Sequence, residues 1–153
     1  GGPIISKLAL KGNMDKIELP RPMINSKDFD FSFSGLKTSV KYLVKENPKI
    51  NVNDLCSSFE QAVTDVLVSK TFKAAARYKI KSIIIGGGVS ANNKLREELK
   101  AKTQKLKYDF YYPELEHTGD NAAMVALAGY YNKKAASLKS YKKLTALPNM
   151  KLV

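Results

Sequence analysis

The sequence is poor in the features that mark secreted, disulfide-bonded or membrane-spanning proteins. Cys56 is the only cysteine, so no disulfide can form within the chain, as expected in a reducing compartment such as the cytoplasm. With no second cysteine and no neighbouring histidine to activate it, Cys56 is predicted to pack like a small apolar residue. Apolar runs are far shorter than the ~20 residues that cross a bilayer, and no charged leader with an apolar stretch precedes Gly1. We therefore expect no membrane partner and no signal peptide.

Acidic residues are also scarce relative to basic ones. The chain has 26 lysines and arginines against 14 aspartates and glutamates, a formal net charge of +12. Such an excess favours a polyanionic partner, because lysines that approach phosphates release condensed counterions. The alternative is a solvated, lysine-rich surface without a specific partner, and charge alone leaves both interpretations open. Lysines occur along the whole chain, with one denser run at Lys133, Lys134, Lys139, Lys142 and Lys143.

Hydrophobic periodicity predicts an α/β fold. Helices are expected where apolar residues recur every three to four positions, and strands where they alternate or form short β-branched runs. These rules predict helices over residues 3–11, 36–45, 53–78 (with Asn53 as the N-cap) and around 95–99, strands over 28–34, 81–85 and 108–112, and a last helix beginning at Asp120. The proline-containing segment 17–23 is expected to be an extended edge. Strand-helix-strand alternation in the second half predicts parallel strands.

The most informative segment is residues 83–96, where a buried strand runs into three glycines and a helix follows. Gly87 and Gly88 have no Cβ, so a ligand can approach the backbone, and the N–H groups of the next helix attract negative charge. Asn92, at the junction of loop and helix, is placed to reach a base, a ribose or an acyl group. The spacing matches neither the Walker loop nor the dinucleotide fingerprint. The alternative is a plain tight turn with Asn92 as a helix cap.

A second polar loop, residues 114–121, follows a predicted strand and is expected at the same sheet edge as the glycine loop. Asp120 has two interpretations, as the N-cap of the next helix or as a hard oxygen ligand for a metal. His117 is the only histidine, and one histidine with scattered carboxylates does not make a metal site within the chain. The residues alone therefore favour Asp120 as an N-cap.

A third segment, residues 28–38, alternates phenylalanine with polar residues and continues into Ser-Gly-Leu-Lys-Thr. Lys37 and Thr38, just beyond a strand end, are placed to hold a phosphate. The alternative, which the residues favour, is an aromatic core strand followed by Ser34 as a helix N-cap. Because the phenylalanine period matches burial, the rings are assigned to the core rather than to base stacking.

Five blocks along the chain together resemble the C-terminal half of one family. They are Gly1-Gly2-Pro3, Pro20-Arg21-Pro22, Phe31 to Thr38, Gly87 to Asn92 and Asp120 to Met124. In this order and spacing they resemble the TsaD-type tRNA threonylcarbamoyladenosine transferases, also described as the Kae-type or "glycoprotease" family. The resemblance covers essentially the whole of residues 1–153.

The resemblance implies a ribonuclease-H-like lobe of the actin-like ATPase superfamily, with residues 1–153 forming the C-terminal lobe of a two-lobed enzyme whose N-terminal lobe is not in this chain. It implies transfer of a threonylcarbamoyl group from threonylcarbamoyl-AMP to N6 of the adenosine immediately 3′ of the anticodon in tRNA. The implied partners are a TsaB-type paralogue and a TsaE-type ATPase subunit, in the cytoplasm.

The resemblance also assigns site residues. Gly2 and Asn92, with the loop glycines Gly87 and Gly88, are implied to bind the adenylate or an ATP-type ligand. Asp120 is implied to ligate one divalent metal, iron rather than zinc, together with two histidines of a His-x-x-x-His motif. That motif is absent from this chain. We therefore expect no turnover by residues 1–153 alone.

Three other functions compete with the transferase. A metallopeptidase, the former label of the family, would need a His-Glu-x-x-His helix, which the sequence lacks. A non-catalytic scaffold paralogue would be expected to have lost the residues at Asp120 and Asn92, and both are present. A general actin-like ATPase or carbamoyltransferase would differ in not requiring tRNA and the adenylate.

Overall fold

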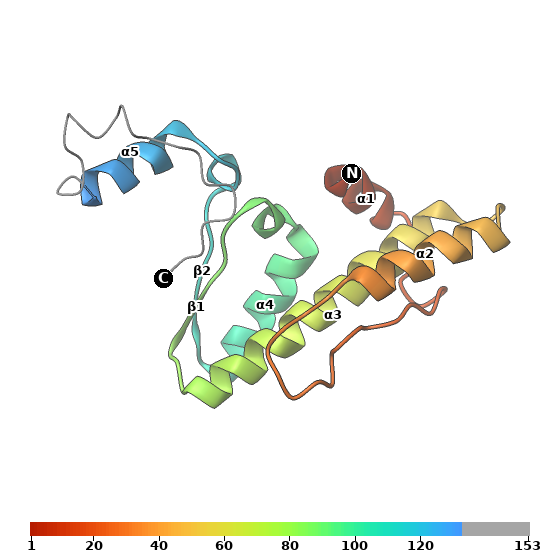
Figure 1. Ribbon diagram of the computed structural model, residues 1–153, viewed down its shortest axis with the longest axis horizontal. Helices are drawn as coiled ribbons and strands as arrows, with labels where there is room; N and C mark the ends of the chain where they lie inside the picture. The colour runs from red at the N-terminus through yellow and green to blue at the C-terminus, as the bar shows by residue number, and fades with distance from the viewer. Residues whose placement is uncertain (133–153) are drawn as a thin grey trace, which may run out of the picture. The chain divides into compact units, whose positions relative to one another are not determined.

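The computed structural model describes residues 1–132, and the lysine run that begins at Lys133 lies outside them. The chain divides into two compact units, residues 1–118 and 119–153. The first contains α1 (Gly2–Ala9), α2 (Ser34–Glu46), α3 (Val52–Tyr78), β1 (Ser82–Ile84), the 3-10 turn η1 (Gly88–Ala91), α4 (Asn93–Leu106), β2 (Asp109–Tyr111) and a second 3-10 turn, η2 (Leu115–His117) (Figure 1). The second contains α5 (Ala122–Tyr131). None of the helices in the described residues has the length and hydropathy needed to cross a bilayer.

The long helix α3 is the central support of the first unit, and α1, α2 and α4 lie along it (Figure 1). It begins two residues earlier than the sequence predicted, because Asn51 and not Asn53 is the N-cap. The Asn51 side chain accepts hydrogen bonds from the backbone N–H of Asn53 at 2.9 Å and of Asp54 at 3.3 Å. Lys79 ends α3 in the left-handed conformation at φ 53°, which satisfies the last carbonyls.

Two hydrophobic clusters use different parts of α3. Near its start, the first cluster contains Leu19, Leu36, Leu55 and Ala62 and joins α2 to α3. Near its end, the second contains Val68, Phe72, Ala75, Ile83, Leu95 and Leu99 and joins α3 to β1 and α4. Because apolar side chains leave α3 on opposite sides, this helix contributes to both clusters along its length.

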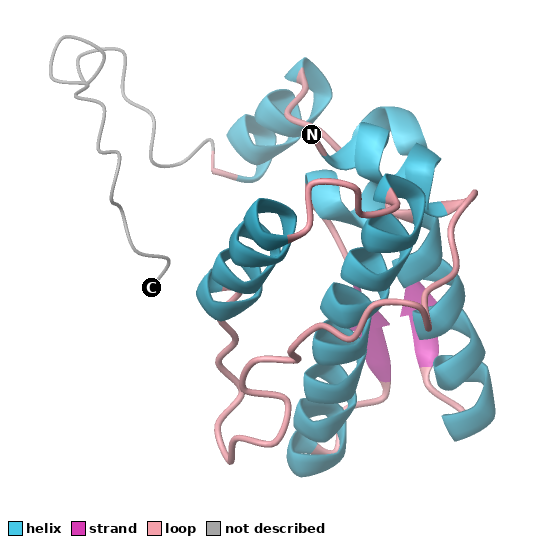
Figure 2. Cartoon of the chain, turned by 90° about the vertical axis from the view of Figure 1, so that its right-hand side faces the viewer, coloured by secondary structure: helices cyan, strands magenta, loops and turns pink. Residues whose placement is uncertain are grey.

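The sheet has two parallel strands in the described residues, with Ile83 paired to Phe110. The connection between them passes through α4, so the predicted strand-helix-strand unit is confirmed. Helices α3 and α4 cover one face of the strands (Figure 2). On the strands' other side, Ile84 is 76% and Tyr111 is 55% exposed. The fold class is α/β, mostly helical with a small parallel sheet.

The predicted strand over residues 28–34 is wrong. The segment is bent and unpaired, and Phe31 is 54% exposed instead of sharing a buried face with its neighbours. The cause is Lys70 on α3, whose fully buried amine donates to the carbonyl oxygens of Asp28 and Asp30 and to the Asp28 carboxylate. These contacts occupy backbone carbonyl oxygens that would otherwise accept hydrogen bonds from a neighbouring strand. Segment 17–23, predicted to be an extended edge, likewise pairs with no strand among the described residues, and its last two residues lie in a turn.

Cys56 is half-buried on α3 and forms no disulfide. Burial, with a smaller contribution from the charge of Glu60, raises the pKa of its thiol. A raised pKa lowers the fraction of reactive thiolate, which agrees with the predicted packing role.

Candidate nucleotide and metal sites

The glycine loop leaves β1 and provides an open surface of backbone. Gly87 has φ 75° and ψ 174°, a conformation that residues with a Cβ rarely adopt. A Cβ built on Gly86, Gly87 or Gly88 would meet no other atom within 4 Å. These glycines are therefore not required by crowding from neighbouring atoms, and the space beside the backbone is open. That is the arrangement a phosphate or acyl group needs for close approach.

Asn92 connects this loop to α4. Its side-chain oxygen accepts a hydrogen bond from the backbone N–H of Leu95 at 2.8 Å, so the predicted N-cap role is confirmed. Its side-chain nitrogen donates to the Glu60 carboxylate at 2.6 Å and to the Ser6 hydroxyl at 3.1 Å. The ligand-binding role of Asn92 stays a prediction. It is compatible with the cap, because the hydrogen bond to Leu95 fixes the position of the amide that would contact a ligand.

Gly2 and Asn92, which the sequence placed in one site, belong to elements that are hydrogen-bonded to each other. Gly2 begins α1, and Ser6 stands one turn later on the same helix face. The Ser6 hydroxyl donates to Glu60 at 2.6 Å and accepts from Asn92. Thus Ser6 of α1 and Asn92, at the end of the glycine loop, are joined through Glu60 of α3.

Arg96 holds the glycine loop by hydrogen bonds to backbone carbonyls, and the sequence did not predict this role. Its guanidinium donates to the carbonyl oxygens of Ser90 and Pro113, the latter at 2.8 Å, and stacks on the Tyr112 ring at 4.8 Å. Ser90 is itself buried and donates from its hydroxyl to the Gly87 carbonyl at 2.7 Å. One arginine therefore joins the glycine loop to the end of β2. No local pattern pointed to it, because its partners lie on two different loops.

The segment around Lys37 and Thr38 gains no support as a phosphate site. Both residues are exposed on the first turns of α2. The predicted cap at Ser34 is wrong, since Phe33 occupies the N-cap position without a side-chain hydrogen bond. Phe33 instead packs, partly buried, against the cluster around Leu36.

Asp120 lies in the second unit, just before α5. The prediction that it caps this helix is wrong, because the side chain of Asn121 accepts the hydrogen bond from the backbone N–H of Met124 at 3.0 Å. Asp120 is exposed, and within residues 1–132 no hydrogen bond or ion pair holds its carboxylate. The side chain fits the requirement for one hard oxygen ligand, and it leaves the remaining ligands to be supplied by other residues.

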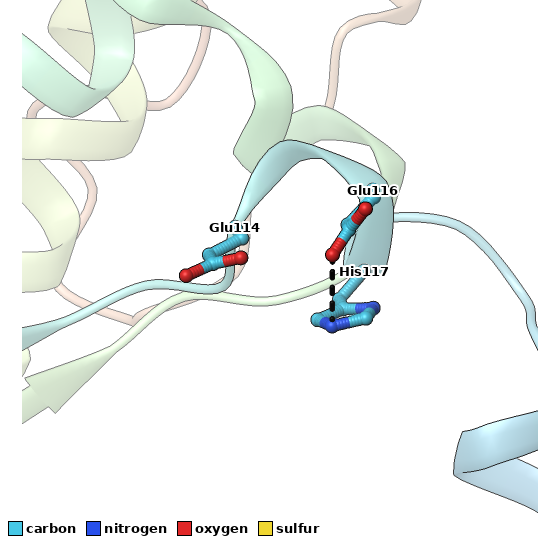
Figure 3. A group of neighbouring side chains, drawn as sticks. All are labelled: Glu114, Glu116 and His117. Atoms are coloured by element: carbon cyan, nitrogen blue, oxygen red, sulfur yellow. Dashed lines mark ion pairs between the residues drawn. The ribbon is translucent and has the colours of Figure 1, made fainter.

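Glu114, Glu116 and His117 are gathered around η2 in the first unit (Figure 3). Their ligand atoms lie within 4.8 Å of one another, and Glu116 is 3.5 Å from the His117 ring nitrogen, an ion pair when the imidazole is protonated. All three side chains are exposed. Exposed acidic groups of this kind are well solvated without an ion, so the cluster is not assigned as a metal site.

Comparison with known proteins places these segments in one family. The family profile of tRNA N6-adenosine threonylcarbamoyltransferase, TsaD, matches residues 1–127. The chain belongs to the TsaD family. The match includes the glycine loop, Asn92 and Asp120, so all site residues named from the sequence lie within it.

Several relatives carry the name tRNA N6-adenosine threonylcarbamoyltransferase. The protein of Thermosipho africanus is 44% identical over 99% of this chain and 46% of its own length. That of Thermotoga neapolitana is 44% identical over 88% of the chain and 41% of its own length. The protein of Thiobacillus denitrificans is 46% identical over 84% and 38%, respectively. The chain thus spans about half the length of the curated relatives that it matches.

Proposed function

We propose that this chain is the C-terminal lobe of a two-lobed tRNA N6-adenosine threonylcarbamoyltransferase, and that this lobe is of the ribonuclease-H-like, actin-like ATPase type. The enzyme moves a threonylcarbamoyl group from threonylcarbamoyl-AMP to N6 of the adenosine 3′ of the anticodon in tRNA. The observation that carries the proposal is the family match over residues 1–127. The strand-loop-helix unit around Gly87 agrees with it, because nucleotides bind at such strand ends.

In this proposal the first unit binds the adenylate. The backbone of Gly87 and Gly88 lies next to the phosphate, where no Cβ obstructs the approach. Gly2 at the start of α1 contributes its own backbone N–H, which favours negative charge, because Pro3 has no N–H and the N–H groups of Ile4 and Ile5 donate to the Gly1 carbonyl. Asn92 contacts the nucleoside from the loop–helix junction. The group that accepts the proton from the adenine amine is not assigned.

Asp120 supplies one carboxylate ligand to a divalent metal, iron in preference to zinc, and two histidines of the other lobe complete the site. Two observations support this role: within residues 1–132 no hydrogen bond or ion pair holds the Asp120 carboxylate, and the cap of α5 is supplied by Asn121. When bound, the metal supplies Lewis-acid polarisation of the carbamate or phosphate oxygens. Asp120 itself only fixes the position of the ligand oxygen.

The partners follow from the same proposal. The net charge of +12 favours tRNA as a polyanionic substrate. A TsaB-type paralogue and a TsaE-type ATPase complete the assembly, and the site of action is the cytoplasm, where tRNA is modified.

The decisive experiment reconstitutes the full-length protein with its partner subunits, tRNA and threonylcarbamoyl-AMP and scores threonylcarbamoyladenosine by nucleoside mass spectrometry. We expect product only when tRNA and adenylate are both present, and none from residues 1–153 alone. Nucleotide binding without any tRNA modification by the full-length protein would overturn the transferase and favour a scaffold paralogue. Cleavage of peptides by the purified protein would instead favour the metallopeptidase.

A further inference from the structure

Glu60 occupies a position on α3 between the two elements proposed to bind nucleotide. A single oxygen of its carboxylate accepts hydrogen bonds from the Ser6 hydroxyl of α1 and from the Asn92 amide at the start of α4, both at 2.6 Å. Ser6 and Asn92 are also bonded to each other at 3.1 Å. These three residues are 32 to 86 positions apart in the sequence. The network therefore depends on the packing of α1 and α4 against α3.

The network fixes the orientation of the Asn92 amide. Its nitrogen faces Glu60 and Ser6, and its oxygen faces the N–H of Leu95. Rotating the amide by half a turn would place its oxygen against the Glu60 carboxylate and its nitrogen against a backbone N–H. Both new contacts are repulsive. Glu60 therefore decides which atoms of Asn92 remain for a ligand. The second lone pair of the side-chain oxygen is available, and a ligand can use the amide nitrogen only by displacing Ser6 or Glu60 from it.

Glu60 has no competing role as an ion-pair partner. Among residues 1–132 it joins none of the salt bridges, and both of its donors are neutral groups. A half-buried carboxylate that is held by two neutral donors strengthens both hydrogen bonds through its charge. This arrangement organises polar groups and does not neutralise a cation.

We propose that Glu60 is a positioning residue of the nucleotide site: it fixes the amide of Asn92 and joins α1, which carries Gly2, to the glycine loop. The proposal rests on the proposed nucleotide-binding function. Glu60 acts through Asn92 and α1 and need not touch the nucleotide. Binding then requires no reorganisation of the junction, which lowers the entropic cost of ordering it.

The test compares Glu60→Ala, Glu60→Gln and Ser6→Ala in the full-length protein, using AMP titrated by calorimetry and the kcat and KM for threonylcarbamoyl-AMP. The matched control is Glu97→Ala, which removes an exposed carboxylate from α4 without touching Asn92. We expect Glu60→Ala to weaken AMP binding and raise KM about tenfold, the factor that losing a charge-assisted hydrogen bond gives, with little change in kcat.

Glu60→Gln keeps an acceptor for the Asn92 amide, so we expect it to recover most of the affinity, and Ser6→Ala to fall between Glu60→Gln and Glu60→Ala. Ser6→Ala also serves if Glu60→Ala does not fold. Equal AMP affinity for wild type, Glu60→Ala and Ser6→Ala would overturn the positioning role alone. A lower melting temperature with unchanged AMP affinity of the folded protein would do the same, because a purely structural contact would give that result. No AMP binding by wild type would overturn the nucleotide site and this role with it.

Discussion

Two helix starts in this chain use the same local chemistry and differ in their surroundings. Asn92 caps α4 and Asn121 caps α5, each by accepting a hydrogen bond from the backbone N–H three residues later, at 2.8 Å and 3.0 Å. The Asn121 amide nitrogen donates locally, to the Gly119 carbonyl at 3.0 Å. The Asn92 nitrogen donates to residues of two other helices.

The junction at Asn92 is held by contacts with other helices of the first unit. Among the described residues, the hydrogen bonds of the Asn121 side chain reach only its near neighbours in sequence. At Asn92, packing of three helices fixes a side chain before any ligand arrives. At Asn121, the cap holds the helix and leaves the neighbouring Asp120 without a partner among the described residues. A preorganised amide suits recognition of a nucleotide, whereas a carboxylate without a partner suits a metal whose other ligands come from elsewhere.

The sharpest test of this comparison removes the two polar side chains at the start of α5 one at a time. We expect Asp120→Ala to lower tRNA modification by more than about a hundredfold and to remove bound metal, because a direct ligand is lost. Asn121→Ala should keep the metal and instead cost about 1 kcal/mol of helix stability. The measurements are nucleoside mass spectrometry, elemental analysis and thermal unfolding. Metal retained in Asp120→Ala would contradict the assignment.

The two caps should also differ in their contribution to folding. Asn92→Ala removes a cap and leaves the half-buried Glu60 carboxylate without one of its donors, so we expect a loss of about 2 to 3 kcal/mol in the free energy of unfolding. Asn121→Ala removes only a cap. Urea unfolding of both variants measures the difference. Equal losses would mean that the Glu60 contact adds nothing to stability.

A smaller effect is expected in the loop that precedes Asn92. Gly87→Ala places a Cβ at φ 75° and should cost on the order of 1 to 3 kcal/mol through backbone strain alone, since the space around it is open. Gly88→Ala, at a glycine whose φ is not positive, is the control and should be close to neutral in stability. Denaturant unfolding compares the two. A neutral Gly87→Ala would show that the loop is not held in this conformation.

The smallest expected effect is a dependence of stability on acid pH. It arises in the segment that contacts Lys70 and not at either helix start. Hydrogen bonds from Lys70 and Ser26 hold the pKa of Asp28 below its ordinary 3.8. A lowered folded pKa contributes stability above pH 3.8 that is lost as the pH falls through the folded value. We therefore expect a slight fall in the melting temperature of wild type below about pH 4, and a weaker fall in Asp28→Asn. Identical pH profiles would exclude this contribution.

Sequence alone determined the elements whose signals are local. The glycine loop, the β-branched strand at 82–84 and the apolar periodicity of α3 and α4 each depend on neighbouring residues, so their positions were predictable to within a few residues. Gly87, Gly88, Asn92 and Asp120 were predicted as site residues because they belong to short motifs and to a family resemblance. Asn92 as a cap followed from its place before a helix.

Only the tertiary structure decided which contacts those residues make. The alternation at residues 28–34 predicted a strand, but the buried amine of Lys70 competes for the backbone carbonyls and bends the segment. The N-caps are Asn51 and Asn121, not the predicted Asn53 and Asp120. The sequence does not distinguish between neighbouring polar residues that can all act as caps, because the backbone geometry selects one of them. Glu60 and Arg96 carry no local signal, since their partners are brought together by helix packing over long separations in the chain.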